Sequence, residues 1–227
     1  MLALFDLDNT LIDRNAGLAR WARGFVRSRF LPQEAEPVIC DRLSERAHPE
    51  DFVSLGEALG LSDAPGDLWH EYVDGIARSV RCFSGVREGI EALRGAGWTI
   101  GLATNGAGDV QRAKLAATGL APLFDGICVS GEVGARKPER HLFEVAAAEC
   151  GVSLSAGGWM VGDNPQTDMN GARAAGLRAL WVAHGREWAH GLREPDVMVP
   201  SIAEAIEVLQ GTGSRSAHLP GLCAAPL

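Results

Sequence analysis

Two aspartates close to the start of the chain are the residues best suited to carry out chemistry. Asp6 and Asp8 are separated by one residue and follow an apolar run, residues 2–5, that is typical of a buried strand. A buried strand seldom ends in two acids unless a compensating charge lies nearby. Because ligands bind at the carboxyl ends of strands in open α/β sheets, the pair suggests a divalent cation, a nucleophile or both.

Further polar residues follow later strand-like segments. Thr104 and Asn105 end one such segment and precede an expected helix, whose free backbone N–H groups favour an anion. Lys137 lies where a loop meets a second expected helix. Asp163 emerges at the end of another strand, and Asp168 follows at an expected helix start. Together with the first two aspartates, these side chains predict one reaction site at the edge of a sheet.

The elements that must position these residues alternate from residue 83 onward. Apolar strand-like segments are separated by helix-like segments with short connections, which predicts an α/β fold with a doubly wound parallel sheet covered on both faces. After the first strand, the expected strands span residues 98–103, 126–130, 158–161, 177–182 and 197–199. The expected helices between and after them span residues 86–95, 109–119, 140–150, 168–176 and 202–209.

The segment between the first and second strands has a different character. It shows apolar residues at helical spacing and no convincing strand, which predicts a bundle of about four helices inserted after the first strand. Trp21, Phe25, Trp69 and Tyr72 are expected to pack its core. The predicted domains are an α/β core of residues 1–13 and 82–210, a helical cap of residues 14–81, and a disordered tail of residues 211–227 with little to bury.

Composition narrows the classes of partner. The chain has 227 residues, a net charge of −8 and a sequence pI near 5.3, and such an acidic surface disfavours nucleic acid and anionic membranes. No signal peptide and no apolar run long enough to span a membrane are visible. The cysteines are far apart with no Cys-x-x-Cys pair, so we expect reduced thiols in a cytoplasmic protein. They are Cys40, Cys82, Cys128, Cys150 and Cys223.

The order Asp-x-Asp-x-Thr, Thr-Asn, Lys-Pro and Gly-Asp-x-x-x-x-Asp resembles the haloacid dehalogenase superfamily of Mg²⁺-dependent hydrolases. A helical cap between the first motif and the second strand is similar to that of the subfamily I phosphatases. The resemblance covers about residues 1–210 and implies a Rossmann-like core. A lone Asp-x-Asp is a weak signal, whereas four motifs in this order are specific.

The resemblance implies a role for each motif. Asp6 would attack phosphorus and form an aspartyl-phosphate, and Asp8 would protonate the leaving alkoxide and then activate water. Thr104 and the backbone around Asn105 would hold the phosphoryl oxygens, and Lys137 would neutralise charge on the phosphoryl group and the nucleophile.

The same resemblance implies Mg²⁺ as cofactor. Its ligands would be a carboxylate oxygen of Asp6, the backbone carbonyl of Asp8 and a carboxylate of Asp163. Asp168 has two open interpretations: it orients a metal-bound water or Lys137, or it caps the following helix.

The implied activity is hydrolysis of a small phosphorylated metabolite. A carboxylate at Asp8 favours phosphate chemistry over dehalogenation, which has no alkoxide to protonate. The cap contains no lysine, which disfavours a Schiff-base mechanism. Two alternatives stay open: a phosphosugar mutase of the same superfamily, and a non-catalytic module that binds a phosphorylated metabolite.

Other features are less informative. Arg46 and His48 are the weak candidates for substrate contact from the cap, although basic residues of the cap, Arg14 included, are more often a solvated face. His184, Trp188 and His190 are possible rim residues. The connections near residues 13–14 and 81–84 are expected to act as hinges, and the chain is expected to be a monomer or homodimer. The substrate itself is not specified.

Overall fold

A parallel sheet of six strands forms the centre of the larger part of the molecule. The computed structural model describes residues 1–216. The strands lie in the order β3-β2-β1-β4-β5-β6, and every pairing between them is parallel. They are β1 (Leu2–Phe5), β2 (Thr99–Thr104), β3 (Gly126–Val129), β4 (Trp159–Gly162), β5 (Arg178–Val182) and β6 (Val197–Val199). The predicted α/β fold with a doubly wound parallel sheet is therefore confirmed.

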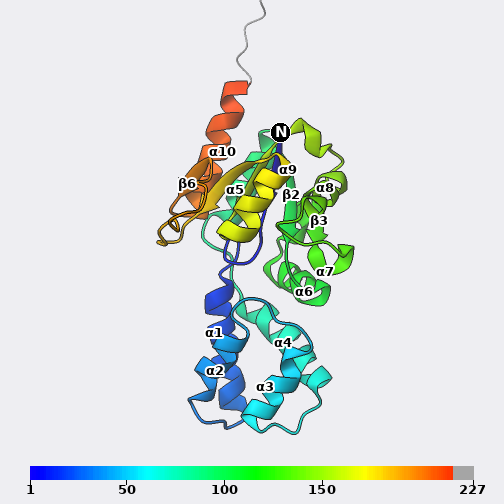
Figure 1. Cartoon of the computed structure of the whole chain (residues 1–227), viewed down its shortest axis with the longest axis vertical. Helices are drawn as coiled ribbons and strands as arrows, with labels where there is room; N and C mark the ends of the chain where they lie inside the picture. Colours follow the sequence, from blue (N-terminus) through cyan, green and yellow to red (C-terminus); the bar gives the residue numbers. More distant parts are fainter. Residues whose placement is uncertain (217–227) are drawn as a thin grey trace, which may run out of the picture.

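Helices cover both faces of this sheet. On one face, α5 (Val86–Gly95) contacts β2, and α10 (Ile202–Ser216) contacts β5 and α5. On the other face, α8 (Arg140–Glu149) contacts β2 and β3, and α9 (Asn170–Ala175) contacts β5 (Figure 1). The remaining helices of this part are α6 (Gly108–Thr118) and the short α7 (Ser130–Val133).

Alternation along β1 explains why two apolar layers form. Ala3 and Phe5 belong to one cluster of buried side chains, and Leu2 and Leu4 belong to a second. Successive strand residues point to opposite faces, so a strand that is covered on both faces must be apolar throughout. All four residues of β1 are buried.

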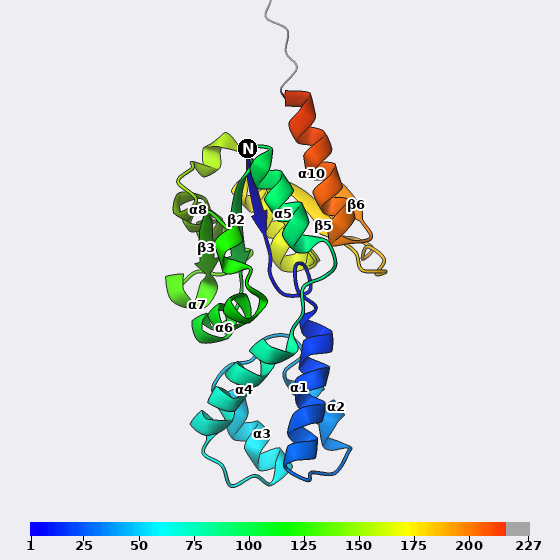
Figure 2. The same cartoon turned by 180° about the vertical axis from the view of Figure 1, so that it is seen from behind.

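Four helices form the segment inserted after β1, which we call the cap (residues 14–80). They are α1 (Arg14–Ser28), α2 (Ala35–Arg42), α3 (Asp51–Leu59) and α4 (Pro65–Ser79). They lie beyond the carboxyl end of the sheet, as the direction of β1 in Figure 2 shows. Trp21, Phe25, Trp69 and Tyr72 are buried and in ring contact with one another or with Phe52, as predicted for the core of this segment.

The cap contacts the core through its helices and through the connections that join the two parts. Helix α4 packs on α6, and the indole Nε1 of Trp69 donates a hydrogen bond of 2.7 Å to Asp109 Oδ2. The two connections also pair with each other: Asp13 N donates to Arg81 O at 2.9 Å, and Phe83 N donates to Leu11 O at 3.0 Å. Whether these paired connections act as hinges stays a prediction.

Two sequence-based boundaries were wrong. Helix α10 continues to Ser216, so residues 211–216 are helical and do not belong to a disordered tail. Glycine lowers helix stability without ending a helix, and Thr212 Oγ1 donates to the Leu209 carbonyl in its last turns. Residues 217–227 lie outside the described residues. The expected helix of residues 168–176 is instead a π-helical turn (Pro165–Met169) followed by α9.

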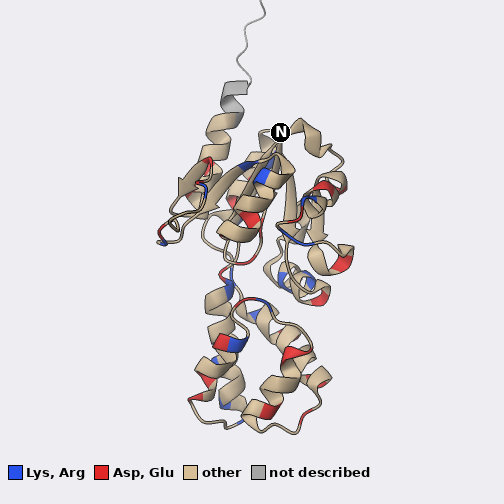
Figure 3. Ribbon diagram, viewed as in Figure 1, with Lys and Arg blue, Asp and Glu red and all other residues tan. Residues whose placement is uncertain are grey.

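Three observations bear on the expectations from composition. Within residues 1–216, no helix combines the length and the apolarity that crossing a membrane would require. The cysteines of this range, Cys40, Cys82, Cys128 and Cys150, are free thiols, and Cys128 is buried in β3. Acidic and basic residues are interspersed over both the core and the cap (Figure 3).

Candidate active site

Lys137 of the third motif contacts one aspartate of the first motif and one of the fourth. Asp6 follows directly on β1, the strand between β2 and β4 where the strand order reverses, which is the usual ligand position in such sheets. The ammonium Nζ of Lys137 lies 2.5 Å from Asp6 Oδ1 and 2.8 Å from Asp168 Oδ1. Lys137 is only 1% exposed and Asp168 is fully buried. Three of the predicted site residues therefore form one buried ionic contact.

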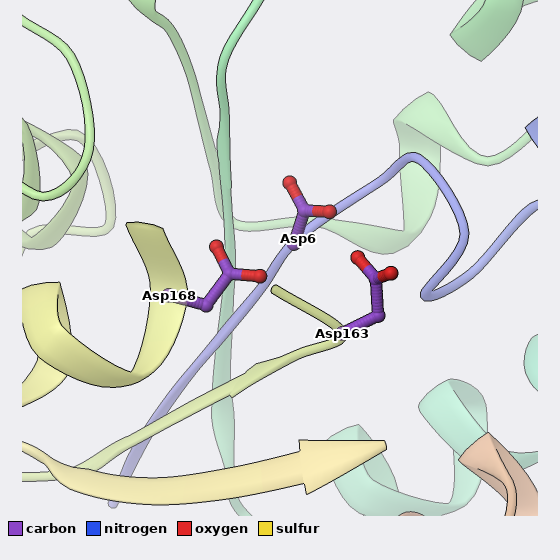
Figure 4. Close-up of side chains that lie close together, drawn as sticks. All are labelled: Asp6, Asp163 and Asp168. Carbon is purple, nitrogen blue, oxygen red and sulfur yellow. The ribbon is translucent and has the colours of Figure 1, made fainter. Parts of the chain in front are cut away.

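Three carboxylates converge beside this contact. Asp6, Asp163 and Asp168 point toward one another from the ends of β1 and β4 and from the turn after β4 (Figure 4). One oxygen of each lies within 4.8 Å of the others. Arg186 donates from its NH2 group to Asp163 Oδ2 at 3.0 Å. We call these four residues together with Lys137 the Asp6 cluster.

Charge in the Asp6 cluster is unbalanced. Three carboxylates face two cations, Lys137 and Arg186. Burial raises the pKa of Asp163 to about 6, with a contribution from Asp168 that Arg186 opposes. Burial also raises the pKa of Asp6, although Lys137 opposes that rise. A surplus of buried, closely spaced carboxylate oxygens is the donor set that a hard divalent cation takes, so these residues fit Mg²⁺.

Asp168 does not cap the helix that follows it. That function belongs to Asn164, whose Oδ1 accepts the backbone N–H groups of Gln166 and Thr167 at 2.9 and 3.1 Å. The carboxylate of Asp168 instead accepts the Asn164 N–H at 3.0 Å and contacts Lys137. The capping interpretation was therefore wrong, because an Asn one turn earlier already satisfies the free backbone donors.

The second motif holds the third in place. Asn105 Nδ2 donates to the Lys137 carbonyl at 3.0 Å, and Asn105 Oδ1 accepts the Lys137 N–H at 2.9 Å. Both polar atoms of the Asn105 side chain are thus hydrogen-bonded to the backbone of Lys137. Thr104 does not cap α6, because the residue at the N-cap is Ala107. Its Oγ1 instead accepts a hydrogen bond of 2.7 Å from Gln111 Nε2.

Asp8 lies in a second group of charges that the sequence analysis missed. Lys114 Nζ, from α6, lies 2.8 Å from both Asp8 carboxylate oxygens, and Gln111 Nε2 donates to Asp8 Oδ2 at 3.2 Å. Arg14 Nε lies 4.0 Å from the same oxygen. We call Asp8, Thr104, Gln111, Lys114 and Arg14 the Asp8 cluster.

A signal for Lys114 was present in the sequence. Lys114 and Lys137 are the two lysines of the whole chain, against 19 arginines. Gln111 and Lys114 are three residues apart in the helix that follows the second motif, which places them on the same helix face. Lysine is a compact point charge, and each of the two in this chain contacts an aspartate of the first motif.

The charges of the Asp8 cluster shift pKa values in the opposite sense to those of the Asp6 cluster. Burial alone would raise the pKa of Asp8, but Lys114 and Arg14 outweigh it and hold that pKa below its ordinary value. Burial lowers the pKa of Lys114, which Asp8 opposes and Arg14 reinforces. Asp8 is therefore ionised, and one carboxylate here faces two cations.

Arg14 is not the solvated residue that the sequence suggested. It is 3% exposed, and its NH1 and NH2 groups donate to the carbonyls of Ser44 and Leu43, both at 2.6 Å. Arg14 begins α1, so it links the entry to the cap, the loop after α2 and the Asp8 carboxylate. Its burial was not foreseeable from helical spacing, because the loop it contacts is about thirty residues away in sequence.

A cavity of about 490 Å³, which we call the catalytic-motif cavity, opens above the two clusters. Of the weak candidates from the cap, Arg46 lines this cavity, whereas His48 lines a neighbouring cavity of about 420 Å³. Possible rim residues are engaged elsewhere. His184 stacks on Phe83 at 4.7 Å, and Trp188 packs against Trp181 at 5.0 Å; neither lines the catalytic-motif cavity.

Comparison with known proteins places the chain among similar sequences and folds. Residues 3–182 match the family model described as haloacid dehalogenase-like hydrolase. A phosphoserine phosphatase of Thermus thermophilus is 44% identical over 108 residues, which are 48% of this chain and 43% of that protein. The pyrimidine 5'-nucleotidase YjjG of Escherichia coli is 33% identical over 159 residues, 70% of this chain and 69% of that protein. The chain thus spans less than half the length of the first relative and about two thirds of the second.

The fold is shared with solved structures. That of the putative HAD-hydrolase YfnB of Bacillus subtilis, bound to magnesium, superposes with a TM-score of 0.72 at 21% sequence identity. The match covers 92% of this chain and 97% of that one. At this identity the likeness concerns the fold.

Proposed function

The chain belongs to the haloacid dehalogenase-like hydrolases, and we propose that it is a phosphatase that hydrolyses a small phosphomonoester with Mg²⁺, through a phosphorylated Asp6. The observation that carries this proposal is the contact of Lys137 with both Asp6 and Asp168 beside a third carboxylate. The two relatives, a phosphoserine phosphatase and a nucleotidase, are named for substrates that have different leaving groups but the same phosphoryl group.

Asp6 is the proposed nucleophile. One carboxylate oxygen forms a bond to phosphorus while the bond from phosphorus to the leaving oxygen breaks, and the electron pair goes to that oxygen. Lys137 holds Asp6 at 2.5 Å and keeps positive charge where the phosphoryl group arrives. The hydroxyl of Thr104, already oriented by Gln111, and the backbone after Asn105 are proposed to bind phosphoryl oxygens.

Asp8 is the proposed acid and base. Its contact with Lys114 favours the charged form, which suits removal of a proton from the water that cleaves the phosphorylated Asp6. For the first half-reaction it must take up a proton, and an arriving phosphate dianion favours that uptake by repelling a second negative charge. The proton passes to the leaving oxygen and returns from the attacking water.

The metal site is proposed at the carboxylates of Asp6 and Asp163 with the backbone carbonyl of Asp8. When bound, Mg²⁺ supplies a Lewis acid that stabilises negative charge on the phosphoryl oxygens. Asp168 is proposed as a positioning residue, since it contacts Lys137 and is fully buried. Location in the cytoplasm and a monomeric or dimeric state stay predictions.

The test is phosphate release from a panel of phosphorylated metabolites and p-nitrophenyl phosphate, with Mg²⁺ and with EDTA. We expect Mg²⁺-dependent release and a phosphorylated Asp6 detected by mass spectrometry after acid quench. Labelling of Asp6 by a sugar bisphosphate without phosphate release would favour a mutase. The absence of both turnover and labelling would favour a non-catalytic binding module.

A further inference from the structure

Two arginines face the junction of two cavities. Arg46 lies in the cap loop between α2 and α3, and Arg136 lies in the core loop immediately before Lys137. Both line the catalytic-motif cavity of about 490 Å³ and the neighbouring cavity of about 420 Å³. They therefore occupy the boundary between the two, one from the cap and one from the core.

Neither guanidinium has a carboxylate partner. Among residues 1–216, no carboxylate oxygen lies within 4.0 Å of Arg46 or Arg136, although Glu45 and Glu139 line the same cavities. Burial lowers the pKa of Arg46, the positive charge of Arg136 lowers it further, and the charge of Asp51 partly opposes both effects. Two guanidinium groups that converge without a carboxylate in contact with either are free to bind an anion between them.

The other arginines of this site are engaged. Arg14 donates to two carbonyls and faces Asp8, and Arg186 is paired with Asp163. The contrast is a local one, because Arg14 and Arg186 line the same cavity as Arg46 and Arg136. Arg46 and Arg136 are distinguished by having terminal N–H groups with no acceptor in the described part of the chain.

Hydrogen bonds hold the Arg46 side chain and the backbone next to Arg136 in place. Arg46 Nε donates to His48 Nε2 at 3.0 Å, and the His48 N–H donates to Asp51 Oδ2 at 2.7 Å. On the core side, Asn105 binds both backbone polar groups of Lys137, the residue next to Arg136. The two loops are thus preorganised, which lowers the entropy lost when a ligand binds.

We propose that Arg46 and Arg136 form a second anion site, so that the substrate is a phosphomonoester whose leaving group carries a second negatively charged group, a carboxylate or a phosphate. This inference rests on the proposed function. The first phosphoryl group would lie at Asp6, and the second anion would lie where the two cavities meet. Guanidinium groups bind carboxylate and phosphate oxygens through paired hydrogen bonds, which is the chemistry this site offers.

Kinetic discrimination tests the proposal. Substrates are compared in pairs that differ in the second anion: phosphoglycolate or 3-phosphoglycerate against glycerol 3-phosphate, and fructose 1,6-bisphosphate against fructose 6-phosphate. We expect wild-type kcat/KM to favour one charged member by roughly tenfold or more, since a hydrogen bond to a charged group is worth about 1.5–3 kcal/mol. The preferred pair identifies carboxylate or phosphate as the second anion.

Substitutions test whether Arg46 and Arg136 cause this substrate preference. The ratio compared is kcat/KM for the substrate with a second anion over kcat/KM for the substrate without one. Arg46→Gln and Arg136→Gln should each reduce this ratio by roughly tenfold, and Arg46→Lys should restore part of it. The matched control is Arg42→Gln, an exposed arginine at the end of α2, which should leave the ratio unchanged. A wild-type ratio near one in every pair, or a ratio unaffected by both substitutions, would overturn the proposal.

A binding measurement separates this proposal from the proposed function. Calorimetric titration with Mg²⁺ compares phosphonoacetate, which carries a carboxylate, and methylenebisphosphonate, which carries a second phosphonate, with methylphosphonate. We expect tighter binding of one of the first two, lost in Arg46→Gln. If phosphomonoesters are hydrolysed without such a preference, only the second anion site is wrong. If nothing is hydrolysed but the preference in binding is found, the site stands and the catalytic proposal fails.

Discussion

The two lysines of this chain are equally buried and differ in almost everything else. Lys137 faces Asp6 and Asp168, and these carboxylates raise its pKa against the effect of burial. Burial lowers the pKa of Lys114, and its one contacting carboxylate, Asp8, does not offset this because Arg14 lies nearby. Both lysines are 1% exposed. Since burial is equal, the difference between the two pKa shifts comes from the neighbouring charges.

The numbers of carboxylates and cations also differ between the two clusters, and this difference explains their separate proposed roles. The Asp6 cluster has three carboxylates and two cations, so it attracts a further cation. The Asp8 cluster has one carboxylate and two cations, so it accommodates negative charge. A phosphate bound between them, with Mg²⁺ on the Asp6 side, would meet positive charge from both directions. The predictions below test this difference, from the largest expected effect to the smallest.

The first prediction concerns the two aspartates of the first motif. Asp6→Asn should reduce Mg²⁺-dependent phosphate release by at least about 1,000-fold for every substrate, because the amide is a poor nucleophile. Asp8→Asn should reduce steady-state phosphate release for every substrate, because Asp8 is also the base for cleavage of phosphorylated Asp6, but it should spare the first turnover of p-nitrophenyl phosphate, whose leaving group needs no proton. Steady-state phosphate release and the pre-steady-state burst of p-nitrophenol measure this, with Asp41→Asn, an exposed position on α2, as control. Loss of the p-nitrophenol burst in Asp8→Asn would contradict a role limited to acid and base.

The second prediction separates the lysines by their response to metal. Lys137→Met leaves buried carboxylates without their cation and should destabilise the metal-free protein by about 3 kcal/mol, part of which Mg²⁺ restores. Lys114→Met should cost about 1–2 kcal/mol, because Arg14 and Gln111 still face Asp8, and Mg²⁺ should not restore it. Urea unfolding with Mg²⁺ and with EDTA measures both. If Mg²⁺ rescued the two variants equally, the clusters would not differ as described.

The third prediction concerns Asp168. Asp168→Asn keeps the shape but removes the charge that holds Lys137, so kcat should fall by roughly 10- to 100-fold while the protein still binds Mg²⁺. Steady-state kinetics together with Mg²⁺ titration measure the two properties separately. Loss of Mg²⁺ binding as well would make Asp168 a direct ligand and not a positioning residue.

The fourth prediction is the pH dependence of the metal site. Burial raises the pKa of Asp163 to about 6, so this carboxyl stabilises the metal-free fold while protonated, and that contribution is lost as pH rises through about 6. Mg²⁺ must displace the same proton, so its affinity should fall by about tenfold per pH unit as pH decreases below about 6. Titration of Mg²⁺ between pH 5 and 8 measures this. An affinity that is constant across this range would show that Asp163 does not bind the metal.

Much of the site was predictable because its motifs follow strands. Asp6 and Asp163 come directly after strands of a parallel sheet, Lys137 lies in the loop after β3 and the short α7, and the carboxyl ends of parallel strands share one edge. Sequence order is then enough to bring such residues together. The contact made by the Asn105 side chain was not predicted, since it reaches a backbone 32 residues away.

The sequence by itself determined the sheet, the presence of an inserted helical segment and the residues of the four motifs, because hydrophobic period and motif order are properties of the chain. Only the tertiary structure decided which residues surround Asp8. Gln111 and Lys114 share a helix face by spacing, yet the packing of α6 against α4 sets where that face points. Arg14 and Arg46 depend in the same way on the fold of the cap, which brings loops from distant parts of the chain to the edge of the sheet. Charge balance and pKa are sums over such neighbours, and those neighbours exist only once the chain has folded.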